Sequence, residues 1–245
     1  MTIRVLLADD HAVMRDGLKV LLQQAADISV VGEVADGREA VRRAQELKPD
    51  VVLMDIAMRE LNGIEATRLL RDQCPATRVV MLSMHSSSEH VFRALEAGAV
   101  GFVLKESAGE EVAAAVRAAH AGRRHLSRAI AALGLTAQSR AGRASPLDSL
   151  SAREREVLQL VVEGRSSTEI AATVHLSPKT VETYRGRLMK KLGANNVTDL
   201  VKFAIEHGLT PSSWGSSPPR AARPHDPDQT GAYLPARRPA IVRFS

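Results

Sequence analysis

The chain has a single cysteine, no long apolar run and no pattern typical of a secretory leader. One cysteine, Cys74, allows no disulfide within the chain, which suits a reducing compartment such as the cytoplasm. No apolar run approaches the ~18 residues that a membrane span requires, and the first four residues lead directly into a strand-like pattern. We therefore expect a cytoplasmic protein with no membrane partner, and its 245 residues leave room for one or two domains.

Charge is distributed unevenly along the chain. The excess of Lys and Arg over Asp and Glu is −4 for residues 1–120, +6 for residues 121–210 and +3 for residues 211–245. An acidic front part favours a bound cation, and a basic rear part favours a polyanion such as nucleic acid. The sequence therefore indicates at least two parts with different ligands.

Four short apolar runs in the front part each end at polar side chains. The runs at residues 5–7, 51–54, 79–82 and 101–104 have the composition of strands that are buried on both faces of a parallel sheet. In an open parallel sheet, ligands bind at the carboxyl ends of the strands. We therefore expect one pocket formed by the groups that follow these runs, namely Asp9, Asp10, Asp55, Ser83 and Lys105.

The charges of such a pocket indicate its chemistry. Carboxylates gathered within a few ångströms repel one another, by about 4 kcal/mol per pair at 4 Å for an effective dielectric of 20. A divalent cation relieves this repulsion, and Mg²⁺ suits all-oxygen ligands and phosphoryl groups. With the cation on one side and Lys105 on the other, a phosphoryl group on Asp55 would be neutralised, and Ser83 could donate a hydrogen bond to it.

Residues 3–120 resemble the receiver domain of two-component response regulators. The similarity depends on Asp9, Asp10, Asp55, Ser83, Phe102 and Lys105 in this order, and residues 3–16 and 51–66 are similar to the NarL/FixJ branch. The resemblance implies an α/β flavodoxin-like fold with a five-stranded parallel sheet of order 2-1-3-4-5. It also implies phosphorylation by a partner histidine kinase.

The resemblance assigns a role to each residue of the pocket. Asp55 is implied to be the phosphoacceptor, with Mg²⁺ held by Asp10, Asp55 and the backbone carbonyl of Ala57, and with Asp9 acting indirectly or through water. Ser83 and Lys105 are implied to contact the phosphoryl group, and Phe102 to rotate inward as part of the switch. One departure concerns the loop beside Asp55, where the family commonly has Pro and this chain has Arg59. The missing Pro frees a backbone dihedral angle there.

Four helical segments follow closely in the rear part. Capping boxes at Ser151 and Ser166 open helices expected over residues 151–163 and 166–175. Ser177 with Pro178 opens a third helix, which Gly193 ends at about residue 192. A fourth is expected over residues 196–207. A short helix, a turn and a longer helix with a basic outer face form the pattern of a helix-turn-helix.

Residues 149–209 strongly resemble the all-α, four-helix LuxR-type helix-turn-helix DNA-binding domain. The matching text includes residues 150–158, 179–184 and 191–193. The resemblance implies that the third helix enters the major groove, with Glu182 and Thr183 toward base edges. The implied phosphate contacts are Lys179, Thr180, Arg187 and Lys190. The last helix is implied to form a dimer contact through Val197, Leu200, Val201 and Ala204.

Two further segments lie outside both resemblances. Residues 121–148 break the strand and helix pattern and are expected to form a linker, with some helix retained near residues 128–135. Residues 210–245 are expected to be a disordered tail, because seven prolines, five arginines and few aliphatic residues after position 210 cannot form a core. The predicted protein is a phosphorylation-regulated transcription factor that binds double-stranded promoter DNA and forms a homodimer when phosphorylated.

Two alternatives remain to be separated by experiment. Some hydrolases also combine an Asp nucleophile, Mg²⁺ and a lysine, but they generally place a second acid two residues after the nucleophile, where this chain has Ala57. Release of phosphate from generic phosphomonoesters would identify such an enzyme. A binding protein with a vestigial pocket would fail to be labelled by acetyl phosphate and Mg²⁺. The intact acids, Ser83 and Lys105 argue against this second alternative.

Overall fold

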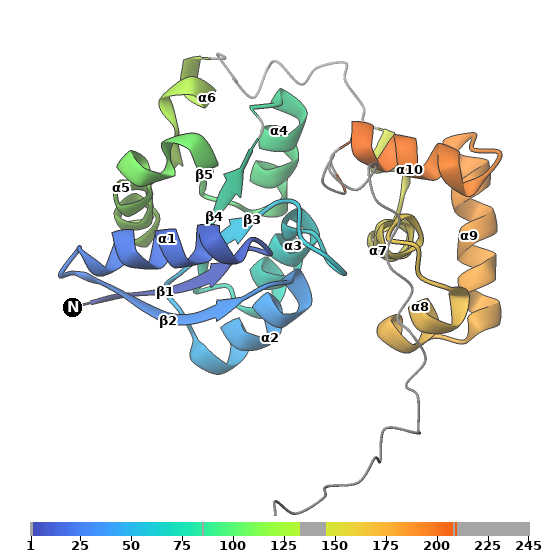
Figure 1. The fold of residues 1–245 in the computed structure, drawn as a ribbon, viewed down its shortest axis with the longest axis horizontal. Coiled ribbons are helices and arrows are strands. Elements are labelled where there is room, and N and C mark those ends of the chain that lie inside the picture. The colour runs from blue at the N-terminus through green and yellow to red at the C-terminus, as the bar shows by residue number, and fades with distance from the viewer. Residues whose placement is uncertain (1, 85, 133–145, 208, 210–245) are drawn as a thin grey trace, which may run out of the picture.

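A computed structural model describes residues 2–84, 86–132, 146–207 and 209. Figure 1 shows a sheet-containing unit followed by a smaller, purely helical unit. Within the described part of the chain, no helix has the length and apolar character needed to cross a bilayer. The predicted tail and the middle of the predicted linker lie outside the described residues.

The first unit is built on a parallel sheet. Its strands are β1 (Ile3–Ala8), β2 (Ile28–Val34), β3 (Val51–Asp55), β4 (Arg78–Ser83), β5 (Gly101–Leu104) and β6 (His125–Leu126), in the order β2-β1-β3-β4-β5-β6. The expected five strands and their order are confirmed. The two-residue β6 extends the sheet beyond the expectation: it pairs with β5 in parallel, and it lies within the stretch predicted to be a linker.

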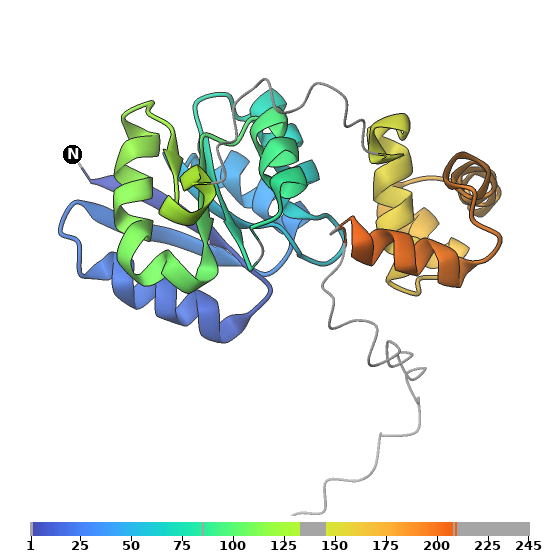
Figure 2. The same ribbon diagram turned by 90° about the horizontal axis from the view of Figure 1, so that it is seen from above.

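Helices cover both faces of this sheet. The structure has α1 (Ala12–Gln23), α2 (Gly37–Leu47), α3 (Gly63–Gln73), α4 (Ser88–Ala97), α5 (Ala108–His120) and the short α6 (Arg128–Ala132). The core on one face contains side chains of α2, α3 and α4, whereas the core on the other contains side chains of α1 and α5. Figure 2 shows the sheet between these two groups. The strands β1, β3, β4 and β5 are therefore buried on both sides, as their continuous apolar runs predict, whereas most of β2 is half-buried.

The second unit consists of four helices around one core. After a 3₁₀ turn (Pro146–Ser149) come α7 (Ala152–Val162), α8 (Ser167–Val174), α9 (Pro178–Leu192) and α10 (Val197–Glu206). Both predicted capping boxes are present, at Ser151 and Ser166. Each serine hydroxyl accepts a hydrogen bond from the backbone amide of the glutamate three residues later, and the carboxylate of that glutamate accepts one from the serine amide. Gly193 ends α9 with a φ of +64°, a conformation that glycine adopts without strain.

Candidate functional site

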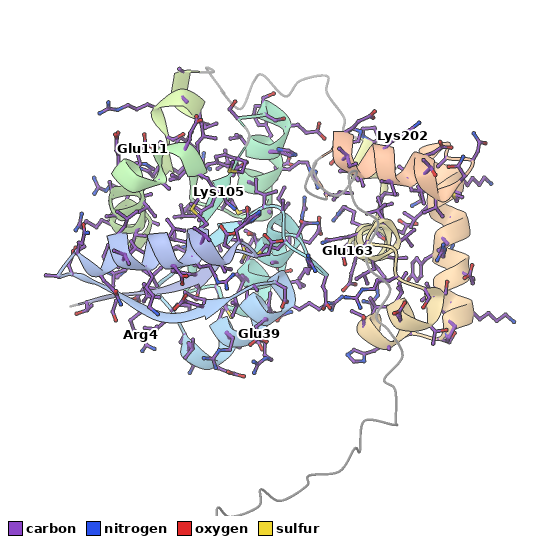
Figure 3. The ribbon with its side chains drawn as sticks, viewed as in Figure 1. Arg4, Glu39, Lys105, Glu111, Glu163 and Lys202 are labelled. Atoms are coloured by element: carbon purple, nitrogen blue, oxygen red, sulfur yellow. The ribbon has the colours of Figure 1, made fainter. Side chains whose placement is uncertain are left out.

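The predicted pocket forms at the carboxyl ends of β1, β3 and β5. The Lys105 ammonium lies 2.8 Å from an Asp9 carboxylate oxygen and 3.0 Å from one of Asp55. All three side chains are almost fully buried, and Figure 3 shows Lys105 inside the first unit. The lysine thus neutralises part of the charge that the clustered carboxylates bring into a poorly solvated place.

The same pocket offers a set of ligands suited to a divalent cation. One atom each of Asp9, Asp10, His11 and Asp55 lies within 4.8 Å of the others. Asp9 is engaged by Lys105 and by the backbone amide of His11 at 2.9 Å, Asp55 shares the Lys105 contact, and Asp10 lies beside the His11 ring. The donor set is rich in carboxylate oxygens, which Mg²⁺ and Ca²⁺ prefer.

The pKa values of the pocket reflect this crowding. Burial raises the pKa of Asp55 from 3.8 to about 6; Lys105 opposes this shift, and the neighbouring charge of Asp9 adds to it. Burial also raises the pKa of Asp10 above its usual 3.8, although His11 opposes the shift. For Lys105, burial acts to lower the pKa, but the ion pairs with Asp55 and Asp9 outweigh it, and the pKa is raised. At neutral pH the pocket therefore holds charged groups at a free-energy cost that a cation would reduce.

The remaining predicted pocket residues lie around this cluster. Ser83 is the last residue of β4 and is 3% exposed. Phe102 is fully buried in β5, so its ring already lies in the interior in this structure. Gly63 opens α3 against the end of β3, since a Cβ there would lie 2.0 Å from the Asp55 carbonyl oxygen. This close approach brings the loop containing Ala57 back over the end of β3.

The outer surface of α9 carries the predicted DNA contacts. Val181 and Leu188 face the core of the second unit and are fully buried. The opposite face has five exposed side chains and the half-buried Thr180; the exposed ones are Lys179, Glu182, Thr183, Arg187 and Lys190. The helix lies on the side of its unit turned away from the sheet (Figures 1 and 2). One basic, solvent-facing helix face of this kind fits the major groove.

Two polar side chains on this face are already oriented by neighbours. Ser167, at the start of α8, donates a hydrogen bond from its hydroxyl to the Glu182 carboxylate. The Thr183 hydroxyl donates to the Lys179 carbonyl at 3.1 Å. Thr183 therefore has its hydroxyl occupied along the helix and its methyl group available to a partner.

The predicted dimer contact of α10 is wrong for two residues. Leu200 and Ala204 are 1% and 0% exposed and belong to the core of the second unit. Their apolar character reflects packing within one chain, and they have no surface to offer a second copy. Val201 also packs against this core, whereas Val197 is 39% exposed.

Two residues at these sites, His11 and Ser167, were not predicted from the sequence. His11 joins the acidic cluster, with its ring nitrogen 2.8 Å from an Asp10 oxygen; its position directly after Asp9 and Asp10 was a signal available in the sequence. Ser167 had no such signal, because its contact with Glu182 joins two helices across the turn.

Comparisons with known proteins agree with this architecture. Residues 5–117 match the model of the response regulator receiver domain, and residues 148–204 match that of bacterial regulatory proteins of the luxR family. The response regulator VraR of Staphylococcus aureus is 37% identical over 209 residues, which cover 85% of this chain and 99% of VraR.

Solved structures show the same relationship. A LuxR-family two-component response regulator from Aurantimonas sp. SI85-9A1 is 41% identical, with a TM-score of 0.52 over 54% of this chain and 94% of that one. A structure of two RcsB dimers bound to two parallel DNAs is 27% identical, with a TM-score of 0.53 over 83% of this chain and 98% of that one. The chain therefore belongs to the LuxR/NarL family of response regulators, which are DNA-binding transcription factors and not enzymes.

Proposed function

We propose that Asp55 accepts a phosphoryl group from a histidine kinase and that this modification controls promoter binding by α9. The observation that carries the proposal is the contact of Lys105 with both Asp9 and Asp55 in a buried acidic pocket. Since the ligand is chromosomal DNA, we place the protein in the cytoplasm.

In the proposed reaction, a carboxylate oxygen of Asp55 attacks the phosphorus of a phosphohistidine. The phosphorus–nitrogen bond breaks as the phosphorus–oxygen bond forms, and the imidazole leaves with the electron pair. Lys105 offsets charge on the transferred group, and the Ser83 hydroxyl donates a hydrogen bond to it. Mg²⁺, held by Asp10, Asp55 and the Ala57 carbonyl, would supply further charge neutralisation.

Recognition of DNA would divide between the two kinds of side chain on α9. Glu182 and the Thr183 methyl group are proposed to meet base edges, the latter suited to a thymine methyl. Lys179, Thr180, Arg187 and Lys190 are proposed to contact phosphates and thereby to set affinity. We propose a homodimer of the phosphorylated protein as the binding form, as the RcsB dimers on DNA suggest.

Labelling with acetyl phosphate and Mg²⁺, followed by intact-protein mass measurement, tests the phosphoacceptor. The parent should gain one phosphoryl group, and Asp55→Ala should gain none. Asp72→Ala is the matched control, because this acid is exposed on α3, outside the pocket, and its labelling should equal that of the parent. Labelling of Asp55→Ala at the parent's level would refute the assignment.

A further inference from the structure

Helix α7 of the DNA-binding unit is docked on the loop that follows the proposed phosphoacceptor. The Gln159 side chain is fully buried there. Its amide nitrogen donates to the Met58 carbonyl at 2.7 Å, and its amide oxygen accepts from the backbone and side-chain nitrogens of Asn62 at 2.8 and 3.0 Å. The Gln159 side chain of the DNA-binding unit thus forms hydrogen bonds with both ends of the loop at residues 58–62 in the first unit.

The side chain of Glu163, the residue directly after α7, holds the middle of the same loop. The Glu163 carboxylate accepts from the Glu60 backbone amide at 2.8 Å and from Gln159 at 3.0 Å, and Figure 3 shows it on the side of α7 that faces the first unit. Glu60 has a φ of +61°, a left-handed conformation that non-glycine residues adopt at a cost. The docked helix therefore supports a loop conformation that the loop would not favour alone.

Ion pairs around this contact fix the orientation of α7. The Arg155 guanidinium reaches the two carboxylate oxygens of Glu65 at 2.7 and 3.2 Å, and both side chains are largely buried. Glu156 pairs with Arg38 of α2. Opposite charges on the two surfaces thus lie against each other. This complementarity attracts the two units and also fixes where α7 lies on the first unit.

The held loop begins three residues after Asp55 and directly follows Ala57, whose carbonyl is a proposed metal ligand. A phosphoryl group adds about −2 of charge and three acceptor oxygens, so any rearrangement of the backbone that brings further donors to these oxygens acts on the loop that α7 holds. While α7 is docked, such a rearrangement breaks the hydrogen bonds to Gln159 and Glu163. Docking and phosphorylation therefore compete for the conformation of one loop.

We propose that Gln159 is a positioning residue for the phosphoacceptor site, through which the docked DNA-binding unit holds the loop at residues 58–62 in its resting conformation and opposes phosphorylation of Asp55. The inference rests on the proposed function. Recognition helix α9 remains uncovered in this arrangement (Figures 1 and 2), so the restraint acts on the phosphoryl site and not by masking the DNA surface.

The affinity of the full chain for beryllofluoride with Mg²⁺, a non-covalent phosphoryl analogue, tests this coupling. We expect Gln159→Ala to bind the analogue at least fivefold more tightly than the parent does. Coupling between two linked sites typically changes an affinity by about 5–150-fold, and this value is at the lower end of that range. Thr173→Ala is the control, because the Thr173 hydroxyl donates to the Glu169 carbonyl within α8, and this variant should bind the analogue as the parent does. Binding by ¹⁹F nuclear magnetic resonance gives the constants directly.

Two results would overturn the inference while leaving the proposed function intact. One is equal or weaker binding of the analogue by Gln159→Ala when the parent binds it. The other comes from Arg155→Glu, which places a second negative charge against Glu65 and should release α7 from the first unit without changing any residue of the loop. If α7 is released and the analogue does not bind more tightly, docking does not affect the phosphoacceptor site. Release is measured independently by faster hydrogen exchange of the Glu60 and Asn62 amides. If the parent itself fails to bind the analogue or to be labelled, the proposed function fails instead.

Discussion

Replacing Asp55 by asparagine should make the metal-free protein more stable at neutral pH. The carboxyl group is 2% exposed, and burial raises its pKa from 3.8 to about 6. A raised carboxyl pKa means that the folded state binds the proton more tightly than the unfolded state does. This stabilisation is complete below pH 3.8 and is lost as the pH rises through about 6.

The size of the effect follows from these two pKa values. At about 1.36 kcal/mol per pH unit, the difference between 3.8 and about 6 corresponds to about 3 kcal/mol of destabilisation at pH 7, where the carboxylate is ionised in both states. Asparagine has nearly the same shape and no charge, and Lys105 keeps its ion pair with Asp9. We expect Asp55→Asn to recover about 1–3 kcal/mol of the free energy of unfolding.

Urea denaturation in the presence of a chelator measures this difference. The advantage of Asp55→Asn should be present at pH 7 and should shrink toward zero near pH 4, where the parent carboxyl is protonated in the folded state. Added Mg²⁺ should also narrow it, because an ion that binds only the folded parent stabilises the parent. Asp72→Asn, on the exposed surface of α3, should show neither effect. A variant no more stable than the parent at pH 7, or an advantage that does not depend on pH, would refute the argument from buried charge.

Other substitutions should separate the steps of the signal. Lys105→Ala should uncouple the two sites, so that acetyl phosphate no longer raises DNA affinity; a labelled variant with the parent's gain in affinity would contradict this. Asp10→Ala should weaken Mg²⁺ binding and slow labelling, and calorimetric titration with unchanged Mg²⁺ affinity would remove it from the metal site. Lys190→Ala should weaken binding to all DNA sequences alike and reduce the slope of log K against log salt by about one. Selection from random DNA should show that Glu182→Ala changes the preferred site, by about 1–3 kcal/mol of discrimination, with little change in salt slope.

The acidic pocket was predictable because its residues share one position relative to the strands. Each polar group follows an apolar run that forms a strand. Because parallel strands bring their carboxyl ends to one edge of the sheet, residues that follow different strands lie close together. The helix ends were equally accessible, because Ser151 and Ser166 each have a glutamate three residues later, and that spacing closes a capping box.

Other features depend on long-range packing that no local pattern records. Gln159 and Asn62 lie 97 residues apart, and nothing near Gln159 distinguishes a docking residue from an ordinary polar residue on an amphipathic helix. The same limit explains the error at Leu200 and Ala204, since apolar spacing on a helix does not reveal whether it faces the core or a second copy. Strand β6 is only two residues long, too short for alternation to be visible.

Strand β6 has a consequence for the solubility of the receiver unit. The strand pairs with the outer edge of β5: the His125 amide donates to the Val100 carbonyl, and the amide of Ser127, the residue after β6, donates to the Phe102 carbonyl. Ile130 of α6 is fully buried against the sheet. The match to the receiver family ends at residue 117, so a fragment cut soon after it would leave an unpaired strand edge beside an emptied apolar site. Such edges recruit strands from other chains. A fragment ending at residue 120 should therefore aggregate, whereas one ending at residue 132 should stay monodisperse in size-exclusion chromatography.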